Sequence, residues 1–268
     1  MFFDYHVHSN FSPDGSMSMD ECISHAIDKN IEEMCFTDHL DIDFPAFSEE
    51  NLDYEKYSSS IDEVRKKYEG RIKINKGIEI GMQPHIINQI YDYIDGKKFD
   101  FIIGSIHVVN GHDICDSSFY EGKSKKEVYN EYLDALYTCI KAFKDFNVLG
   151  HIDIIKRYCH FEDRNMYFEE FGDYITPIYK ELIQSGRGIE INTSGIRYKV
   201  GSAHPTVDLL KAYRNLGGEI ITTGSDSHSY EYLAYNFGPT LDILRDCGFK
   251  YITIFRDRKP VQIKIWLA

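Results

Sequence analysis

The segment Phe2-Phe3-Asp4-Tyr5-His6-Val7-His8 decides how the rest of the chain is interpreted, because a short β-rich run ends here in two histidines. Residues i and i+2 of a strand point to the same face, so His6 and His8 would converge at the carboxyl end of a strand. Alone, an H-x-H pair is weak evidence for metal binding, because polar residues commonly end strands. The pair gains weight only if other strands of the chain end in similar residues.

Short β-rich runs recur and alternate with amphipathic helical stretches. The expected strands are Phe2–Val7, Met34–Thr37, Ile72–Ile80, Phe99–Ile106, Val148–Ile152, Gly188–Asn192 and Glu219–Thr223. The expected helices are Met19–Lys29, Tyr54–Tyr68, Pro84–Tyr93, Lys125–Phe143, Phe168–Ser185 and Thr206–Leu216. This alternation predicts an α/β fold of βα units with parallel strands. Seven units favour a closed or nearly closed barrel, although a doubly wound sheet shares the pattern.

The end of the chain offers one more element. Tyr251–Phe255 could form an eighth strand, followed by a segment that ends at Trp266. We expect residues 1–268 to form a single domain, because a chain of this length can bury a full core by itself.

Histidines and acids gather at the ends of the other expected strands. Six of the eleven histidines lie there, and Glu79 lies inside an apolar strand, where an unpaired carboxylate is costly. The residues in question are His6, His8, His39, Glu79, His107, His151, Asp226 and His228. Each could instead be an ordinary core histidine or a helix cap, and Asp14 in Ser12-Pro13-Asp14-Gly15 could be only a turn residue. In a (β/α) barrel, however, this edge carries the active site.

These residues together predict a multinuclear metal site. The potential ligands are imidazoles and carboxylates without thiolates, which suits Zn, Mn or Fe. Nine ligands, with Asp14 included, exceed what one ion needs, so two or three ions are expected. Glu79 could bridge two of them through its two oxygens.

The motifs occur in the order H-x-H, S-x-D-G, T-D-H, G-x-E, S-x-H, G-H-x-D and S-D-x-H between Phe2 and His228. This order resembles the polymerase and histidinol phosphatase (PHP) superfamily. The resemblance implies a distorted (β/α)7 barrel with a trinuclear metal site. It assigns one metal to His6, His8, Glu79 and Asp226, a second to Glu79, His107 and His151, and a third to Asp14, His39 and His228.

Two further segments look like the stand-alone histidinol-phosphatase branch of that superfamily. They are Asp153-Ile154-Ile155-Lys156-Arg157-Tyr158 and Glu190-Ile191-Asn192-Thr193-Ser194-Gly195-Ile196-Arg197. The resemblance implies hydrolysis of L-histidinol phosphate to L-histidinol and phosphate, with attack by a metal-bridging hydroxide. Glu79, Asp226, His228, Arg157 and Arg197 would form the catalytic set.

Arginine forks suit phosphate, so Arg157 and Arg197 are candidate phosphate-binding residues; surface salt bridges are the alternative. Asn192 could contact substrate or simply end a strand. Asp41 and Asp43 are candidate partners for the amine and imidazole of the substrate, or solvated loop acids. We also expect Asp4, Asp38 and Asp153 to orient metal-binding imidazoles.

Composition and the absence of certain segments argue against several kinds of partner and location. The chain has 30 Lys and Arg against 43 Asp and Glu, a net charge of −13, which argues against nucleic acid as partner. No apolar run approaches the length of a membrane span, and no signal peptide is recognisable. Six dispersed cysteines without a C-x-x-C pair suggest buried thiols, so a cytoplasmic location is expected. The sequence does not indicate an oligomeric state.

Three alternatives remain open. One is another PHP phosphoesterase that acts on nucleotides, oligonucleotides or phosphotyrosine. A second is a non-catalytic metal-binding regulatory domain, which would bind metal without turnover. A third is a metal-dependent amidohydrolase, which phosphate would not be expected to inhibit.

Overall fold

The computed structural model describes residues 1–45 and 51–265, so Trp266 lies outside the described residues. The strands are β1 Phe2–Val7, β2 Ile31–Phe36, β3 His39–Leu40, β4 Lys73–Gly81, β5 Phe101–Ser105, β6 Val108–Val109, β7 His112–Asp113, β8 Val148–Leu149, β9 Gly188–Asn192, β10 Ile221–Gly224, β11 Tyr251–Arg256 and β12 Lys259–Lys264. The helices are α1 Met19–Asp28, α2 Tyr54–Lys67, α3 Ile87–Ile94, α4 Lys125–Ala142, α5 Phe168–Gln184, α6 Ser194–Arg197, α7 Val207–Asn215 and α8 Phe237–Asp246, with 3-10 turns η1 Ser117–Tyr120, η2 Ile154–Arg157 and η3 Tyr230–Tyr232.

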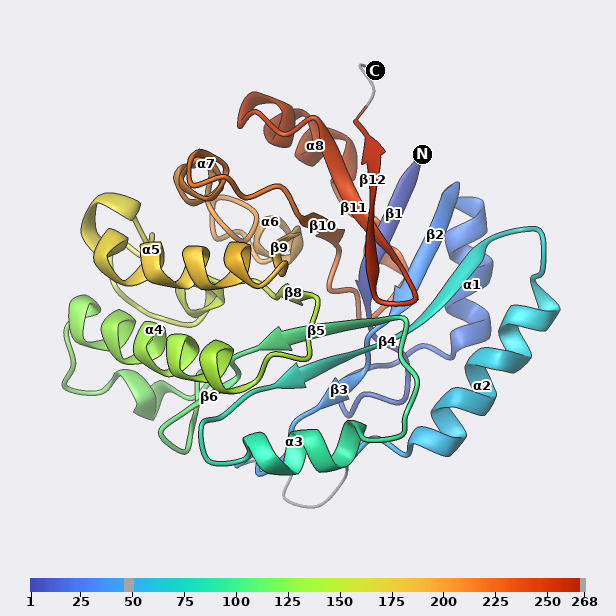
Figure 1. Cartoon of the computed structure of the whole chain (residues 1–268), viewed down its shortest axis with the longest axis horizontal. Helices are drawn as coiled ribbons and strands as arrows, with labels where there is room; N and C mark the ends of the chain where they lie inside the picture. The colour runs from blue at the N-terminus through green and yellow to red at the C-terminus, as the bar shows by residue number, and fades with distance from the viewer. Residues whose placement is uncertain (46–50, 266–268) are drawn as a thin grey trace.

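The main sheet is parallel, in the order β1-β2-β4-β5-β8-β9-β10, and these strands correspond to the seven expected ones. Helices surround the strands on the outside (Figure 1). The two edge strands approach each other through a parallel bridge between Val7 and Ser227, and Asp226 N donates to His6 O at 2.8 Å. The sheet is therefore a nearly closed barrel, which confirms the predicted fold class.

The barrel is distorted beside β4. The first half of β4 pairs with β2, with Asn75 opposite Cys35, whereas its second half pairs with the short strand β3. This exchange places His39 opposite Glu79. The distortion thus brings a histidine from the second βα unit onto the carboxylate of the third.

The first expected helix begins where its capping residue predicts. Ser18 accepts a hydrogen bond from Glu21 N, while the Glu21 side chain accepts one from Ser18 N, which is a capping box. Helix α1 then buries Cys22, Ile23 and Ala26 against the barrel. The other expected helices lie within one to three residues of their predicted ends.

The prediction of an eighth barrel strand was wrong. Strand β11 pairs antiparallel with β12 and lies outside the parallel sheet. The ring of Phe255 packs against Tyr5 and Phe101, and Arg256 bonds to both carboxylate oxygens of Glu33. Because Phe101 begins β5 and Glu33 lies in the first half of β2, the hairpin covers the amino-terminal end of the barrel (Figure 1).

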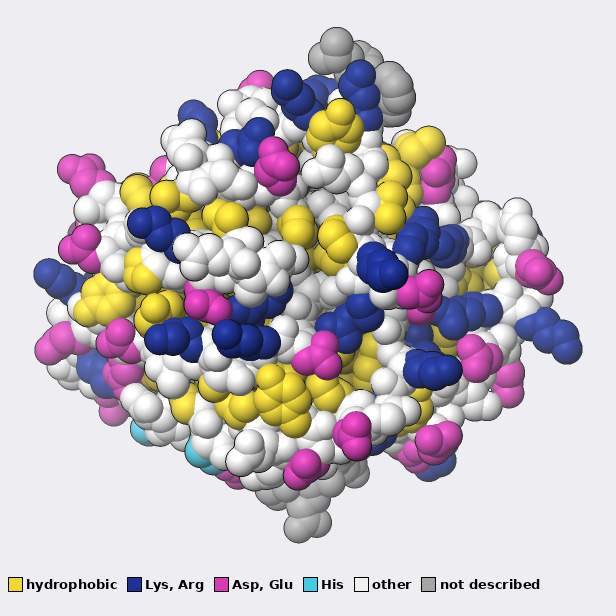
Figure 2. Space-filling view, viewed as in Figure 1, with side chains coloured by type: hydrophobic (Ala, Val, Ile, Leu, Met, Phe, Trp, Pro, Cys, Tyr) yellow, Lys and Arg dark blue, Asp and Glu magenta, His cyan; other side chains and the backbone are white. Residues whose placement is uncertain are grey.

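Several elements had no prediction, namely β3, the β6–β7 hairpin, α6 and α8. Five cysteines are buried and Cys115 is exposed, and none forms a disulfide. No described helix combines the length and apolar character needed to cross a membrane. On the face seen in Figure 2, Lys and Arg side chains are interspersed with Asp and Glu, and histidine shows only at the lower left edge.

Candidate metal centre

Glu79 lies near the carboxyl end of β4 and is 1% exposed. Its Oε2 atom lies 3.1 Å from His6 Nε2, 3.5 Å from His8 Nε2 and 3.2 Å from His39 Nδ1. These imidazoles come from β1 and β3, whose carboxyl ends meet here. One oxygen of Glu79 therefore faces three imidazoles.

The other oxygen of Glu79 faces a separate pair of histidines. Its Oε1 atom lies 2.9 Å from His151 Nε2 and 3.4 Å from His107 Nε2, and it accepts a hydrogen bond from Ser105 Oγ at 2.7 Å. His107 follows β5 and His151 follows β8. The two oxygens thus point into two adjacent clusters, as a bridging carboxylate requires.

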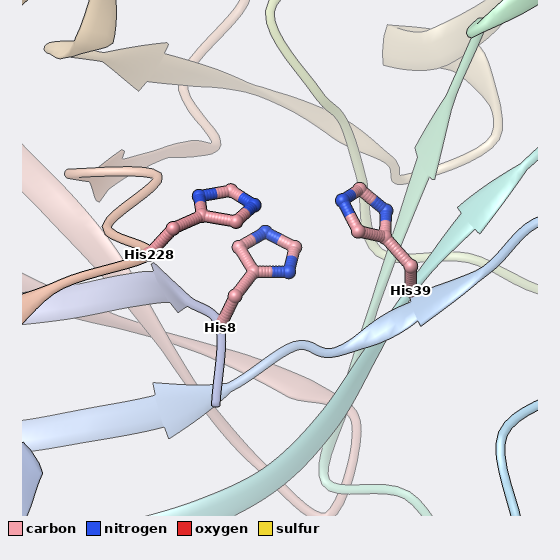
Figure 3. Close-up of side chains that lie close together, drawn as sticks. All are labelled: His8, His39 and His228. Atoms are coloured by element: carbon pink, nitrogen blue, oxygen red, sulfur yellow. The ribbon is translucent and has the colours of Figure 1, made fainter. Parts of the chain in front are cut away.

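Asp226, Asp14 and His228 complete the set. Asp226 Oδ1 lies 3.7 Å from His6 Nε2 and 3.5 Å from His8 Nε2. Asp14 Oδ2 lies 3.1 Å from His228 Nε2, and its Oδ1 lies 3.8 Å from His39 Nε2. Figure 3 shows the rings of His8, His39 and His228 converging from β1, β3 and the loop after β10. The structure therefore brings all nine predicted ligands together, while their role in binding metal stays a prediction.

Unpaired buried atoms give an independent test of whether cations fit. Within the described part of the chain, six buried polar atoms of these residues form no hydrogen bond, although some face each other as closely as 3.1 Å: His6 Nε2, His8 Nε2, His39 Nδ1, Glu79 Oε2, His151 Nδ1 and His228 Nε2. Among the described residues, four overlapping groups of these side chains each gather three potential ligand atoms within 4.8 Å of one another. Buried polar atoms are normally paired, so their clustering here fits divalent metal ions.

Hydrogen bonds on the opposite ring nitrogens orient three of the imidazoles. His6 Nδ1 lies 2.6 Å from Glu190 Oε1, and His107 Nδ1 lies 2.8 Å from Asp41 Oδ1. His8 Nδ1 lies 3.0 Å from Ser12 Oγ, which in turn donates to Asp38. Each contact leaves Nε2 directed at the cluster, which is the arrangement that metal-ligating histidines use.

The electrostatics of the cluster favour ionised acids. Burial alone would raise the pKa of Glu79, but His6, His107 and His39 hold that pKa well below its ordinary value. Burial lowers the pKa of His8 far below its ordinary value, and His228 and His39 lower it further. Although burial opposes the shift, Glu190 and Glu79 raise the pKa of His6 well above its ordinary value, and Asp41 and Glu79 do the same for His107. Without metal the ionised acids therefore face protonated imidazoles, and a bound cation would take the place of those protons.

The geometry agrees with comparisons to known proteins. The family model for the PHP domain matches residues 4–194. The chain belongs to the PHP domain family. It is 33% identical to a probable histidinol-phosphatase of Clostridium acetobutylicum, over 93% of this chain and 95% of that protein. It is 32% identical to the histidinol-phosphatase of Lactococcus lactis, over 96% and 95%.

A solved structure resembles the whole PHP chain. The crystal structure of histidinol phosphate phosphatase from Lactococcus lactis, complexed with Zn, L-histidinol and phosphate, has a TM-score of 0.89 and 30% identity. The match covers 97% of this chain and 98% of that one.

A cavity of about 780 Å³ opens over the histidine cluster of this PHP chain. Arg157 lines it, and its guanidinium lies 3.2 Å from the centre of the Tyr198 ring. Arg197 donates to the carbonyl oxygen of Asp226 at 2.9 Å and to that of Ser225 at 3.4 Å. Arg157 therefore faces the cavity, whereas Arg197 braces the loop that carries Asp226.

The other expected substrate contacts have less support. Asn192 is fully buried and its amide bonds to Glu190 and to Ser194 N. Asp43 is exposed and pairs with His85 at 2.7 Å, outside the residues that line the cavity. Asp41 lines the cavity, but its oxygens contact His107 at 2.8 Å and His39 at 3.2 Å. Their contacts with substrate stay predictions.

Two expected supporting residues bind different partners. Asp153 pairs with His204 Nδ1 and Lys156 Nζ, both at 2.7 Å, and not with the neighbouring ligand candidate His151. Asp4 accepts hydrogen bonds from Ser225 and from Ala234 N, so it holds the loop after β10 and no imidazole. Neither residue contacts an imidazole of the candidate metal ligands, so both predictions were wrong in that respect, because sequence adjacency does not fix side-chain direction at the end of a strand.

Glu190 is a functional candidate that the sequence interpretation missed. It is 1% exposed, bonds to His6 Nδ1 through Oε1 and accepts a hydrogen bond from His151 N through Oε2 at 3.1 Å. It sits between Ile189 and Ile191 in β9. The signal that singled out Glu79, an acid inside an apolar strand, applies equally to Glu190.

Proposed function

We propose that this protein is a metal-dependent phosphatase that hydrolyses L-histidinol phosphate to L-histidinol and phosphate, a step in histidine biosynthesis. The observation that carries the proposal is the full-length similarity to the Lactococcus lactis enzyme, whose structure contains Zn, L-histidinol and phosphate. The nine clustered candidate ligands supply the matching site in this chain. We also propose that residues 1–268 act as one domain.

We propose a trinuclear centre. His6, His8, Glu79 and Asp226 would hold one ion, Glu79, His107 and His151 a second, and Asp14, His39 and His228 a third. Zinc is supported by the Lactococcus lactis structure, and manganese or iron also suit this donor set. When bound, such ions act as Lewis acids on the phosphoryl oxygens and make water a stronger nucleophile.

The chain's own residues would bind and position the substrate. Arg157 lines the cavity and can pair with phosphoryl oxygens as a planar fork. Arg197 holds the carbonyls of Ser225 and Asp226, so it would position Asp226 and His228. Asp226 and His228 border the cavity and are the candidates for assisting departure of the leaving alkoxide. A proton would come from His228, because the neighbouring histidines hold the pKa of Asp226 well below its ordinary value.

Phosphate release from a panel of esters tests the proposal. The panel holds L-histidinol phosphate, phosphotyrosine, a nucleoside 3′,5′-bisphosphate and a short oligonucleotide, with metal content measured in parallel. We expect kcat/KM for L-histidinol phosphate to exceed the others by about a thousandfold, which corresponds to roughly 4 kcal/mol of discrimination. A flat profile or a preference for nucleotides would remove the substrate assignment. Bound metal without any turnover would favour a binding domain.

Glu79→Gln is the matched test of the centre, because the amide keeps the shape and removes the charge that both clusters share. We expect loss of bound metal and of activity together.

The six unpaired cysteines suit a reducing compartment, so we expect the enzyme to act in the cytoplasm.

A further inference from the structure

Asp113 differs from the other carboxylates that line the cavity. Asp14, Asp41, Glu79 and Asp226 all contact histidines of the cluster. Asp53 pairs with Lys56 at 2.8 Å. Within residues 1–45 and 51–265, Asp113 forms no ion pair with a Lys, Arg or His side chain. Among the carboxylates that line the cavity, Asp113 is therefore the one without a cationic partner in the described residues.

The β6–β7 hairpin places Asp113 beside the candidate ligand His107. Asp113 pairs with Val108, the residue after His107, and Ile114 N donates to His107 O at 3.0 Å. Asp113 Oδ1 accepts a hydrogen bond from Cys115 N at 2.7 Å, which fixes the orientation of the carboxylate. The half-buried side chain is thus held at the cavity wall, next to the centre and independent of it.

The proposed substrate has a cation that suits this position. In L-histidinol phosphate, the ammonium group is on the carbon next to the phosphorylated CH₂ group. When the phosphoryl group lies at the histidine cluster, the ammonium must lie close to the part of the cavity wall that borders this cluster. Ile114 and Cys115 follow Asp113 in the cavity wall, Tyr158 contacts Cys115, and none of the three is cationic. The nearby His107 is engaged by Asp41 and Glu79. The two basic side chains of the cavity, Arg157 and Lys56, have their own anionic or aromatic partners.

We propose that the carboxylate of Asp113 binds the ammonium group of the substrate and so selects amino-alcohol phosphates over esters without the amine. This inference rests on the proposed function and deepens it. Asp41 and Asp43 are poorer candidates, since Asp41 is engaged by His39 and His107 and Asp43 pairs with His85.

The test compares Asp113→Asn with the native protein on two substrates. One is L-histidinol phosphate, and the other is 3-(imidazol-4-yl)propyl phosphate. This analogue lacks the amine, and the carbon that carried it is therefore no longer a stereocentre. We expect kcat/KM of the variant for L-histidinol phosphate to fall about thirtyfold, the size of one hydrogen bond to a charged group. The loss should fall mainly on KM, because the ammonium does not change during the reaction. The analogue should change less than about twofold.

Asp92→Asn is the control, because Asp92 is an exposed acid on α3 and loses the same charge. An equal loss on both substrates, or no loss, would overturn the inference while the proposed function stands. If the native protein does not hydrolyse L-histidinol phosphate, the proposed function fails and the inference falls with it. Melting temperature and metal content verify the variant; if it is unfolded, Asp113→Ser and Asp113→Glu take its place, and only the serine variant should lose the preference for the amine.

Discussion

Glu190 lies behind the candidate centre, and its contacts predict that it supports metal binding without being a ligand. One oxygen of Glu190 contacts His6 Nδ1 and the other accepts a hydrogen bond from His151 N. His6 faces Oε2 of Glu79 and His151 faces Oε1, so Glu190 supports both clusters. We expect Glu190→Gln to weaken metal binding about 10- to 100-fold, because the amide cannot support the imidazole as a carboxylate does. Titration with a metal-binding dye measures this, and exposed Glu162→Gln is the control. Unchanged affinity in Glu190→Gln would mean that the contact is only structural.

His204 provides a prediction at the same scale that does not involve the metal ligands. Burial and Lys156 lower the pKa of His204 to about 4, although Asp153 opposes the shift. The unfolded chain, with an ordinary histidine pKa, therefore binds the proton more readily than the folded one. Stability should fall as the pH decreases from about 6.5 to 4, by roughly 3 kcal/mol from this residue.

Urea unfolding at several pH values measures the effect. His204→Gln retains a donor for Asp153 but cannot take up the proton, so its stability should depend less on pH across this window. His160→Gln, at an exposed histidine, is the control. An identical pH dependence in the native protein and His204→Gln would refute the assignment.

The residues that the sequence could identify were those that end strands. His6, His8, His107, His151, Asp226 and His228 follow from strand ends alone, and Glu79 follows from its cost in an apolar strand. Residues that reach the centre through a third group, such as Ser12 between His8 and Asp38, could not be found, because such a contact depends on loop conformation.

At the scale of elements, the turn η2 ends at Arg157, and a buried ion pair between Lys156 and Asp153 holds this turn in place. Lys156 Nζ is fully buried and bonds to Asp153 Oδ2 at 2.7 Å, to Ser202 Oγ at 2.9 Å and to Ala203 O at 3.1 Å. Lys156→Met would leave Asp153 buried without this cation, which typically costs about 3 to 5 kcal/mol. Because Arg157 is the next residue, inhibition by inorganic phosphate should also weaken.

Urea unfolding and phosphate inhibition measure the two effects. Lys126→Met removes an exposed lysine from α4 and should change neither. Loss of stability with unaltered phosphate inhibition would separate the ion pair from the position of Arg157, and full stability would contradict the prediction altogether.

Elements with a periodic pattern were predictable and the others were not. The seven parallel strands and the six expected helices have apolar periodicity, and α1, α2 and α4 also have a side-chain N-cap, so their positions followed from the sequence. Strand β3 has two residues and exists because β4 offers it pairing positions beyond the end of β2. The role of β11 was misjudged, because a β-rich run does not reveal whether its partner is parallel or antiparallel.

At the scale of the whole molecule, the centre joins segments from nearly the entire chain. Its nine candidate ligands run from His6 to His228 and come from the carboxyl ends of β1, β3, β4, β5, β8 and β10 and from the loop at Asp14. Bound ions would therefore link most of the barrel strands at one end, while the β11–β12 hairpin links them at the other. Metal occupancy should influence the stability of the entire fold, and not only activity.

We expect removal of metal with a chelator to lower the melting temperature by about 10 °C. A ligand present at a thousandfold excess over its Kd stabilises the folded state by about 4 kcal/mol, and a protein of this size shifts by roughly 2 to 4 °C per kcal/mol. Six buried polar atoms of the candidate ligands that lack hydrogen-bond partners in the described part of the chain are the physical reason to expect that the metal-free protein is less stable than the loaded one. Adding zinc back should restore the melting temperature, whereas Glu79→Gln should respond little to either treatment. A metal-free protein that melts at the same temperature as the loaded one would show that the barrel is held by its core and hairpin alone, and that the imidazoles are kept in place by their supporting hydrogen bonds.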